Sequence, residues 1–388
     1  MTRQDFIKLC SLFGISLPFQ SVLASCKSDD INNTTNFNGN VLIIGAGAAG
    51  LSAGYLLQQR GIDFRILEAA PTYGGRMKRT TDFADFPIPL GAEWLHMEEG
   101  IFNEIVNDSS ISIDVNTTLY DPDNDFTLYD GELISLGEDG FTIDQKFINS
   151  TWFDFFDEYI VPSVENKILF NTIVESIDYS ENQVMVNTSG TSFSADKVIV
   201  AVPVKQLQNN AITFTPQLPS KKRNAINNVT VWDGFKAFIE FSDQFYPTFI
   251  AYDILPESAG QKLYYDAAYG QNTNQHILGL FTVGAGTLPY RELEDNQLIE
   301  YILNELDGLF NGQASATYIK HISQNWNNEP YINGAYIMDQ ENWRRVRTLG
   351  ESVNDKLYFA GDAYTDGEDW SSVHTAARSA KQAVDNLL

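Results

Sequence analysis

The first part of the chain combines short apolar runs with a glycine-rich turn and one helical segment. Residues 41–44 (VLII) form an apolar β-type run that leads directly into GAGAAG. Residues 51–61 then place apolar side chains at helical spacing and end at Gly61. A second apolar run, residues 64–67, ends at Glu68. This order predicts two parallel strands joined by a helix.

The rest of the chain carries strand-like runs with helical segments between them. The predicted strands are residues 171–174, 183–187, 191–193, 197–202, 231–241 and 357–360, with further aromatic strands inside 260–325. The predicted helices are residues 147–161, 295–310 and 373–388. Strands and helices together predict an α/β protein rather than an all-helical one.

The turn after the first strand has the spacing of a dinucleotide-binding loop. It contains Gly45, Gly47, Ala48, Ala49 and Gly50. In such loops the first glycine makes the tight turn, the second admits the pyrophosphate and the third lets the helix pack on the strand. Glu68 suits the hydroxyls of the adenosine ribose and disfavours NADP, whose 2′-phosphate would face a carboxylate. The motif leaves NAD and FAD open, and a glycine-rich turn of an unrelated α/β fold is the alternative.

Residues 1–26 have the pattern of an export signal. A short charged start precedes an apolar stretch that is too short and too interrupted to span a bilayer as a stable helix. The sequence LASC resembles the lipobox of bacterial lipoproteins, in which Cys26 would carry the lipid. Residues 2–8 resemble an incomplete twin-arginine signal, so the export route stays open. We therefore expect a periplasmic or cell-surface lipoprotein of a bacterium; a buried N-terminal helix is the alternative.

Composition narrows the function classes. The 388 residues include 51 acidic and 25 basic side chains, with a formal net charge of −26. Such a charge repels phosphate backbones, which argues against a nucleic-acid partner. It suits solubility first and a cationic substrate second. Cys10 and Cys26 are the only cysteines, so a mature chain starting at Cys26 has no disulfide, thiolate metal site or cysteine nucleophile, and we predict no metal.

A second glycine pair completes a family signature. Gly74 and Gly75 let the backbone lie against a ligand, and Arg76 can neutralise pyrophosphate charge. Together with GAGAAGLSAGYLL and Glu68, these residues resemble the flavin-dependent amine oxidase family of monoamine, polyamine and L-amino-acid oxidases and flavin histone demethylases. The resemblance runs from about residue 40 to residue 388. A strand that ends in Gly361-Asp362 then indicates FAD rather than NAD.

The resemblance implies further contacts to FAD. The segment LGAEWLH resembles the one that crosses the flavin face in the family, and contributes Gly91, Ala92, Glu93 and Trp94. Val174 is expected to contact the adenine through its backbone, and Asp362 the ribityl or ribose region. Ser372 and Val373 start the last helix, whose N–H groups would stabilise negative charge on the flavin pyrimidine. Ala335 stands where monoamine oxidases have the cysteine that bonds FAD, so the FAD is predicted to be non-covalent.

Four residues are predicted to be catalytic from the resemblance. A family lysine at the position of Lys236 holds a water beside flavin N5; from the pattern alone, a solvent-facing lysine on an edge strand is the alternative. Tyr336 corresponds to one wall of the aromatic substrate cage, and Trp326 opens the same stretch. His96 corresponds to a histidine of the substrate tunnel in polyamine oxidases. For the aromatic residues, core packing is the alternative.

The implied reaction oxidises a C–N bond of an amine to an imine and passes the electrons to O₂, giving H₂O₂, or to another acceptor. No arginine stands where L-amino-acid oxidases hold a carboxylate, and Glu93, Glu98 and Glu99 favour a cation. A primary amine or polyamine is therefore preferred over an amino acid. An L-amino-acid oxidase, a desaturase or porphyrinogen-type flavoprotein, and a flavin-binding lipoprotein without turnover are the alternatives. The oligomeric state stays open.

The predicted fold is α/β, a Rossmann-like FAD-binding domain with an inserted α+β substrate domain built on a mixed sheet. The predicted segments are an export signal at 1–26, a linker at 27–40, FAD-binding parts at 41–95, 166–230 and 326–388, and substrate-domain parts at 96–165 and 231–325.

Overall fold

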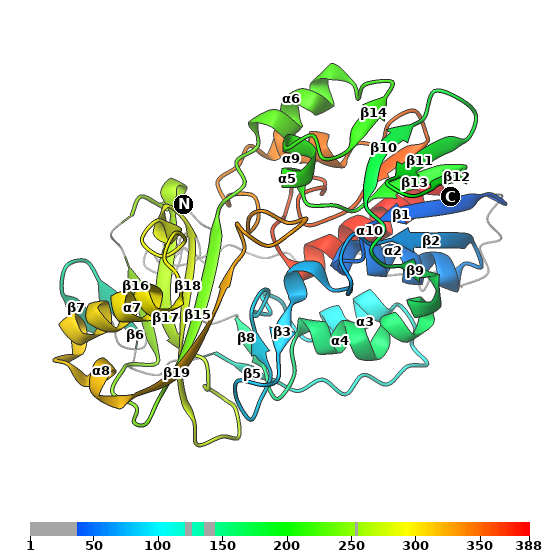
Figure 1. Cartoon of the computed structure of the whole chain (residues 1–388). Coiled ribbons are helices and arrows are strands. Elements are labelled where there is room, and N and C mark those ends of the chain that lie inside the picture. Colours follow the sequence, from blue (N-terminus) through cyan, green and yellow to red (C-terminus); the bar gives the residue numbers. More distant parts are fainter. Residues whose placement is uncertain (1–36, 121–125, 136–143, 253–254) are drawn as a thin grey trace, which may run out of the picture.

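The computed structural model describes residues 37–120, 126–135, 144–252 and 255–388 (Figure 1). The predicted export signal with Cys10 and Cys26, and residues 27–36 of the predicted linker, lie outside these ranges. Phe37, near the end of the predicted linker, packs against the core of the fold. Within the described ranges, every helix is too short or too polar to cross a bilayer.

A five-stranded parallel sheet, in the order β20-β13-β1-β2-β9, gathers distant parts of the chain. Its strands are β1 (Asn40–Ile44), β2 (Asp63–Leu67), β9 (Ile168–Leu169), β13 (Lys197–Val200) and β20 (Leu357–Phe359). Parallel strands end at the same edge of a sheet, and ligands bind in the crevice beyond that edge. The glycine turn after β1, Glu68 after β2 and Gly361 after β20 therefore meet there.

Helices and a second sheet cover the two faces of this sheet. Side chains alternate along β1: Val41 and Ile43 face the helical layer, whereas Leu42 and Ile44 face the other side. The helical layer contains α2 (Ala48–Gln59), α3 (Gly100–Val106), α4 (Trp152–Tyr159) and α10 (Val373–Leu387). The other layer contains a sheet in the order β12-β11-β10-β14, and the helices α5 (Val204–Gln208), α6 (Ser220–Asn228) and α9 (Trp343–Gly350). The strands of that sheet are β10 (Val174–Asp178), β11 (Val184–Thr188), β12 (Ser192–Ala195) and β14 (Thr213–Thr215).

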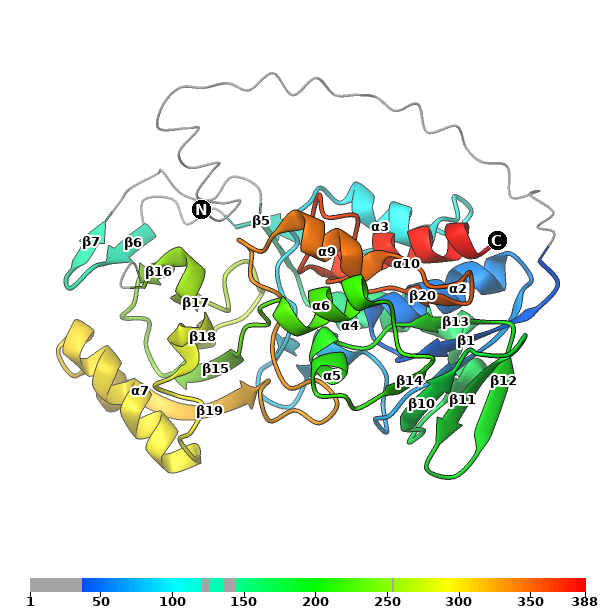
Figure 2. The same ribbon diagram turned by 90° about the horizontal axis from the view of Figure 1, so that it is seen from above.

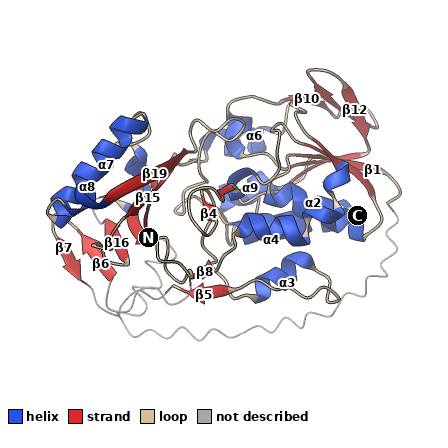
Figure 3. Cartoon of the chain, turned by 60° about the horizontal axis from the view of Figure 1, so that its bottom comes forward, coloured by secondary structure: helices blue, strands red, loops and turns tan. Residues whose placement is uncertain are grey.

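A seven-stranded mixed sheet, in the order β19-β15-β18-β17-β16-β6-β7, forms the other end of the molecule (Figure 2). Its strands are β6 (Phe126–Tyr129), β7 (Leu133–Ser135), β15 (Gly234–Phe241), β16 (Phe249–Tyr252), β17 (Gly260–Asp266), β18 (His276–Gly284) and β19 (Tyr318–Asn325). The helices α7 (Asp295–Phe310) and α8 (Gln313–Thr317) lie against one face (Figure 3). The predicted α/β fold with a second part built on a mixed sheet is confirmed.

Shorter elements complete the described part of the chain. The remaining strand pairs are β3 (Arg79–Thr80) with β4 (Ile88–Pro89), and β5 (Thr117–Leu119) with β8 (Gln145–Phe147). The 3₁₀ turns are Gly75–Met77, Val161–Ser163, Glu165–Lys167, Glu257–Ala259 and Ala285–Thr287. The predicted helix at 147–161 is shortened at both ends. Residues 145–147 pair as β8, and the Thr151 hydroxyl accepts a hydrogen bond from the Asp154 N–H and so caps α4.

β15 lies between β19 and β18, which makes it an interior strand. Its side chains alternate: Phe235, Ala237 and Ile239 pack on the α7 side, whereas Phe238 packs on the opposite side. Lys236 shares the face of Phe238 and is 4% exposed. The alternative of a solvent-facing lysine on an edge strand is therefore excluded.

Lys222 joins α6 to the C-terminal end of α9. Its ammonium lies 2.6 Å from the carbonyl oxygens of Leu349 and Glu351 and 3.6 Å from the centroid of the Phe359 ring. Burial lowers the pKa of Lys222 from 10.5 to about 7. The unfolded chain therefore binds the proton of the Lys222 ammonium more tightly than the folded chain does. For this reason the free energy of unfolding rises with pH between about 7 and 10.5.

We expect Lys222→Met to remove this pH dependence. Between pH 7 and 9, the unfolding free energy of the wild-type protein should rise relative to that of the variant by up to about 1.4 kcal/mol per pH unit, measured by urea unfolding. Lys221→Met, which changes the exposed neighbour paired with Glu351, should keep the wild-type slope. Equal slopes for Lys222→Met and wild type would contradict the prediction.

Candidate active site

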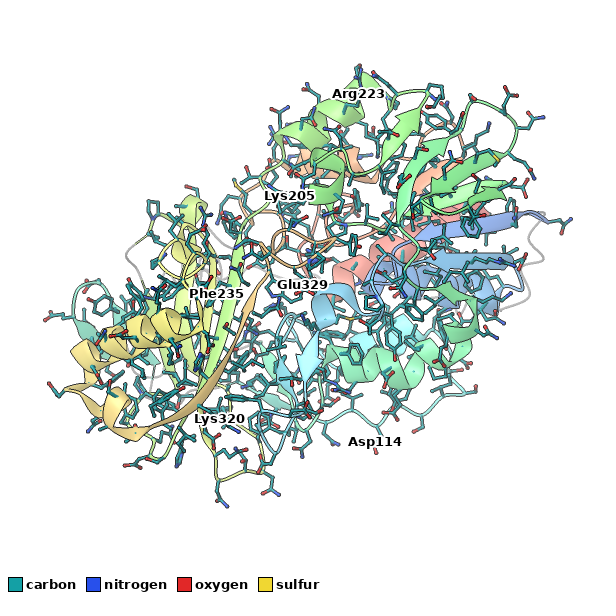
Figure 4. All side chains as sticks on the ribbon, viewed as in Figure 1. Asp114, Lys205, Arg223, Phe235, Lys320 and Glu329 are labelled. Atoms are coloured by element: carbon teal, nitrogen blue, oxygen red, sulfur yellow. The ribbon has the colours of Figure 1, made fainter. Side chains whose placement is uncertain are left out.

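A cavity of about 1530 Å³ runs from the edge of the parallel sheet to the face of the seven-stranded sheet that carries Lys236, opposite α7. Pockets for drug-sized ligands have about 300–1,000 Å³, so this one has room for a longer ligand together with a second molecule. Of its lining residues, Phe235 lies on the seven-stranded sheet, and Glu329 lies between the two ends of the molecule (Figure 4). The predicted site residues that line it are Gly45, Gly47, Ala48, Ala49, Glu68, Gly75, Arg76, Gly91, Ala92, Glu93, Trp94, His96, Val174, Lys236, Trp326, Tyr336, Gly361, Asp362, Ser372 and Val373.

The glycine turn leaves a cradle for a ligand. Gly45 has a φ of +103°, which favours glycine. A Cβ on Gly50 would lie 1.9 Å from the Gly45 carbonyl oxygen, so Gly50, which does not line the cavity, lets α2 pack against the turn. A Cβ on Gly47 would meet no atom within 4 Å, and this residue borders the cavity. The turn therefore fits a pyrophosphate over the start of α2.

Glu68 closes this end of the cavity. Its carboxylate accepts hydrogen bonds from the N–H groups of Ala46 at 2.5 Å and Ala70 at 2.8 Å. These bonds tie the end of β2 to the glycine turn after β1. Burial raises the pKa of Glu68, and the hydrogen bonds from Ala70 and Ala46 oppose that rise. The residue borders the cavity and fits an acceptor for sugar hydroxyls.

Arg76 and Asp362 join the two ends of the sequence across the cavity wall. The Arg76 guanidinium donates to both oxygens of Asp362, at 2.6 and 3.0 Å, and also to the carbonyl oxygen of Ala335. Both side chains were predicted to contact the cofactor, and in the structure they pair with each other. The pair orders the segments after β2 and β20 beside one cavity, and its charges cancel locally.

Lys236 lies at the centre of a buried charge cluster. Its ammonium donates to the carbonyl oxygens of Pro89 at 2.9 Å and Gly91 at 3.1 Å, and to the Glu93 carboxylate at 2.7 Å. Burial lowers the pKa of Lys236, and Glu93 opposes that shift. Burial alone would raise the pKa of Glu93, but Lys236 and Lys146 hold it below its usual value. Lys236 therefore fixes the backbone of residues 89–93, of which 91–93 line the cavity.

Glu93 was predicted to favour a cationic substrate through its charge, but that charge faces two buried lysines of the protein. Its side chain is 4% exposed and its charge is paired. Glu98 and Glu99 are exposed but do not line the cavity. The carboxylates that border the cavity beyond the predicted set are Asp144, Glu329, Asp339, Glu368 and Asp369.

Two histidines border the cavity beside carboxylates. His96 Nδ1 lies 2.8 Å from Asp144, and His374 Nε2 lies 3.3 Å from Asp369. Burial lowers the pKa of His374, and Asp369 opposes that shift. Sequence reasoning predicted His96 but missed His374, which directly follows the predicted Ser372-Val373 pair at the start of α10.

The predicted aromatic residues fall into two environments. The Trp326 indole N–H donates to the Leu90 carbonyl oxygen at 3.1 Å, so this buried ring braces the cavity-lining segment. Tyr336 packs edge-on against Trp232, at 5.9 Å between ring centroids. Burial, with Asp339 nearby, raises the pKa of Tyr336 well above its usual value, so its hydroxyl stays protonated. Both residues border the cavity.

The described residues contain no cluster of three or more histidine, cysteine, aspartate or glutamate side chains suited to a metal ion. The cavity instead combines a phosphate cradle, a sugar acceptor and a helix N-terminus. The Ser372 hydroxyl accepts a hydrogen bond from the Thr375 N–H, and the Thr375 hydroxyl accepts one from the Ser372 N–H. This pair caps α10 at the cavity. This residue set fits a dinucleotide with one end at Glu68 and the other near α10.

Comparison with known families supports that fit. Residues 156–388 match the family described as flavin containing amine oxidoreductase, and residues 43–108 match the NAD(P)-binding Rossmann-like domain. Lysine-specific histone demethylase 1B of Mus musculus is 32% identical over 168 residues, which cover 42% of this chain and 20% of that protein. The human lysine-specific histone demethylase 2 is also 32% identical, over 21% of its length. The chain thus spans about a fifth of these two demethylases.

Other relatives match over most of their length. Polyamine oxidase 3 of Oryza sativa subsp. japonica is 23% identical over 391 residues, which cover 77% of this chain and 79% of that protein. A solved structure of a putrescine oxidase triple mutant superposes with a TM-score of 0.74 at 14% identity, covering 90% of this chain and 98% of that one. At this identity the superposition shows a shared fold.

Proposed function

The chain belongs to the flavin containing amine oxidoreductases, and from this membership we propose that it oxidises a primary amine or polyamine with non-covalent FAD, reducing O₂ to H₂O₂. The observation that carries the proposal is the single cavity joining the dinucleotide cradle to Lys236, Trp326 and Tyr336. Polyamine and putrescine oxidases among the similar proteins favour the same substrate class.

The residues of the chain orient and shield the reactants. FAD, when bound, supplies the two-electron acceptor for oxidation of the amine to an imine. Gly47 and the start of α2 would hold its pyrophosphate, and Glu68 its ribose. Lys236 and Trp326 fix the backbone that forms the cavity wall. The N-terminus of α10 places N–H dipoles at the cavity, where they stabilise negative charge.

A primary amine or polyamine is preferred over an amino acid because of the charges at the cavity. Glu368 borders it, and so do Asp144 and Asp369, which lie beside His96 and His374. Together these carboxylates attract an ammonium group. The cations that border it include Lys236 and Arg76, and both are paired with carboxylates of the protein. A substrate carboxylate would compete with those internal partners.

An anaerobic bleaching assay tests the proposed function. The purified protein is reconstituted with FAD, its visible flavin absorption is recorded, and diamines, polyamines, monoamines and L-amino acids are added without oxygen. Bleaching by amines, followed by H₂O₂ formation when air is admitted, is expected. The N-acetylated amine is the matched control and should leave the band unchanged. Bleaching by L-amino acids alone, or by no compound, would overturn the proposal.

We expect acid precipitation to release all of the flavin into the supernatant. Ala335 carries no thiol, and the two cysteines of the chain both precede residue 27. The measurement is the flavin absorbance of pellet and supernatant after treatment with trichloroacetic acid. A yellow pellet that resists washing in denaturant would indicate a covalent bond and contradict the prediction.

We also propose export and lipid anchoring through Cys26, which rests on the sequence alone. Cys26→Ser should move the protein from the membrane fraction of a bacterial host to the soluble exported fraction, as measured by fractionation and immunoblot. Cys10→Ser is the matched control and should stay with the membrane. Equal distribution of Cys26→Ser and wild type would count against the anchor.

A further inference from the structure

We propose that Lys146 and Glu93 are positioning residues: Glu93 neutralises Lys236, and Lys146 supplies the positive potential behind the cavity wall that favours electron uptake by the bound flavin. The inference deepens the proposed function and rests on it. It concerns Lys146, which no sequence motif singled out.

The first observation is that Lys236 is fully engaged by the protein. An ammonium group has three N–H donors. Those of Lys236 have three acceptors at 2.7–3.1 Å, namely the Glu93 carboxylate and the carbonyl oxygens of Pro89 and Gly91. The positive charge of Lys236 is therefore compensated at contact distance by Glu93.

The second observation is that the same carboxylate faces a second buried lysine. Lys146 Nζ lies 3.6 Å from the other Glu93 oxygen, and the Lys146 side chain is 3% exposed. It donates to the carbonyl oxygens of Asp266 at 3.2 Å and Ala267 at 2.8 Å. The Tyr265 hydroxyl completes the carboxylate's partners. The three buried side chains, two lysines and one glutamate, carry a net charge of +1 when all are ionised, and the half-buried Asp266 carboxylate near Lys146 offsets part of it.

Groups around Lys146 maintain its charged form in part. Burial lowers the pKa of Lys146, and the repulsion from Lys236 acts in the same direction. The carboxylates of Glu93 and Asp266 oppose both effects. Removing the positive charge of Lys146 should therefore make the electrostatic potential at the cavity more negative, and removing the negative charge of Glu93 should make it more positive.

The third observation is that aromatic rings surround this ammonium. It lies 5.6 Å from the Trp94 ring centroid, 5.8 Å from that of Tyr120 and 5.5 Å from that of Tyr265. Trp94 and Tyr120 border the cavity, whereas Lys146 does not. The ammonium is thus stabilised by ring faces and acts on the cavity through its wall.

The cost of this arrangement argues for a role in the site. Burying an ion costs several kcal/mol, and an apolar group of similar volume often packs as well. A buried lysine that is paired with a carboxylate behind a cavity wall is a candidate for a functional role. A positive wall favours the added negative charge of a reduced flavin and the neutral form of an amine.

The midpoint potential of the bound flavin tests the proposal, because removing a negative charge and removing a positive charge should shift it in opposite directions. Full-length wild type, Glu93→Gln and Lys146→Met are reconstituted with FAD and titrated against reference dyes. Glu93→Gln should favour the reduced flavin about tenfold, and Lys146→Met should disfavour it about tenfold, which is about 30 mV in opposite directions for a two-electron couple. The double variant should return close to the wild-type potential.

Controls separate charge from packing. Lys262→Met removes a buried lysine that pairs with Glu305 and does not line this cavity, so it should leave the potential unchanged. Lys146→Arg keeps the charge and should resemble wild type, whereas Lys146→Gln should resemble Lys146→Met. If Glu93→Gln does not fold, the difference between Lys146→Arg and Lys146→Gln tests whether the charge of Lys146 sets the flavin potential. Shifts of the same sign for Glu93→Gln and Lys146→Met, or no shift in the Lys146 variants, would overturn the proposal. Failure of the wild-type protein to bind FAD would instead overturn the proposed function.

Discussion

Lys236→Met is expected to lower the rate of amine oxidation about a hundredfold, the size of effect that a misplacement of the reacting groups by about 1 Å produces. The side chain holds Pro89, Gly91 and Glu93 in place. Without it, the segment that lines the cavity loses three hydrogen bonds, and the reacting groups lose their alignment. The Glu93 carboxylate keeps Lys146 and Tyr265 as partners, so we expect the variant to fold, with a stability loss of about 3 kcal/mol.

Stopped-flow measurement of flavin reduction by the amine and of reoxidation by O₂ checks this result. Lys381→Met, on the exposed face of α10 and paired with Asp385, should keep wild-type rates. Lys236→Arg keeps the charge and should retain more activity than Lys236→Met. If Lys236→Met binds FAD and both half-reactions keep wild-type rates, Lys236 does not act in this site.

Gly50→Ala is expected to abolish FAD binding and to destabilise the fold by several kcal/mol. The added Cβ would lie 1.9 Å from the Gly45 carbonyl oxygen, a backbone atom that cannot yield as a flexible side chain can. Either α2 moves away from β1 or the turn opens, and both changes remove packing from the core between them. The loss should appear in urea unfolding and as absence of the flavin band after reconstitution.

Two further glycines distinguish packing from ligand contact. Gly47→Ala adds a Cβ in open space beside the cavity, so its stability should match wild type while its FAD affinity falls. Gly308→Ala, inside α7 and free of close contacts, should keep the FAD affinity and raise the unfolding free energy by about 0.5–1 kcal/mol, because alanine favours a helix over glycine. Normal FAD affinity and stability in Gly50→Ala would show that α2 tolerates a wider separation from the turn than its contacts indicate.

Local patterns in the sequence predicted the elements that depend on local interactions. The helix at 295–310 matches α7 residue for residue, because its apolar spacing and its end before Asn311-Gly312 are properties of one segment. The strand–turn–helix unit around Gly45 was also predicted from local sequence, because the geometry of the turn itself requires glycine at these positions. Helix α4 is shorter than predicted, because the Thr151 cap and the pairing of β8 with β5 compete with its apolar pattern.

Resemblance to a family placed residues along the cavity that no local pattern connects. Val174, Lys236 and Tyr336 are ordinary strand or loop residues by pattern, and all three border the cavity. The family roles of these residues stay predictions. The charge of Glu93 was misread, because charge in a sequence does not tell whether a side chain faces water or a buried lysine. Glu98 and Glu99 face water but do not line the cavity.

The sequence by itself determined the nucleotide-binding turn, the acid after the second strand and the membership of an amine oxidoreductase family. Only the tertiary structure decided which charges meet. Arg76 pairs with Asp362 across 286 positions, and Glu93 pairs with Lys236 across 143. Lys146 joins that pair from a third segment. Such contacts depend on how the sheets pack, because periodicity fixes the face on which a side chain lies but not the partner that the opposite face brings to it.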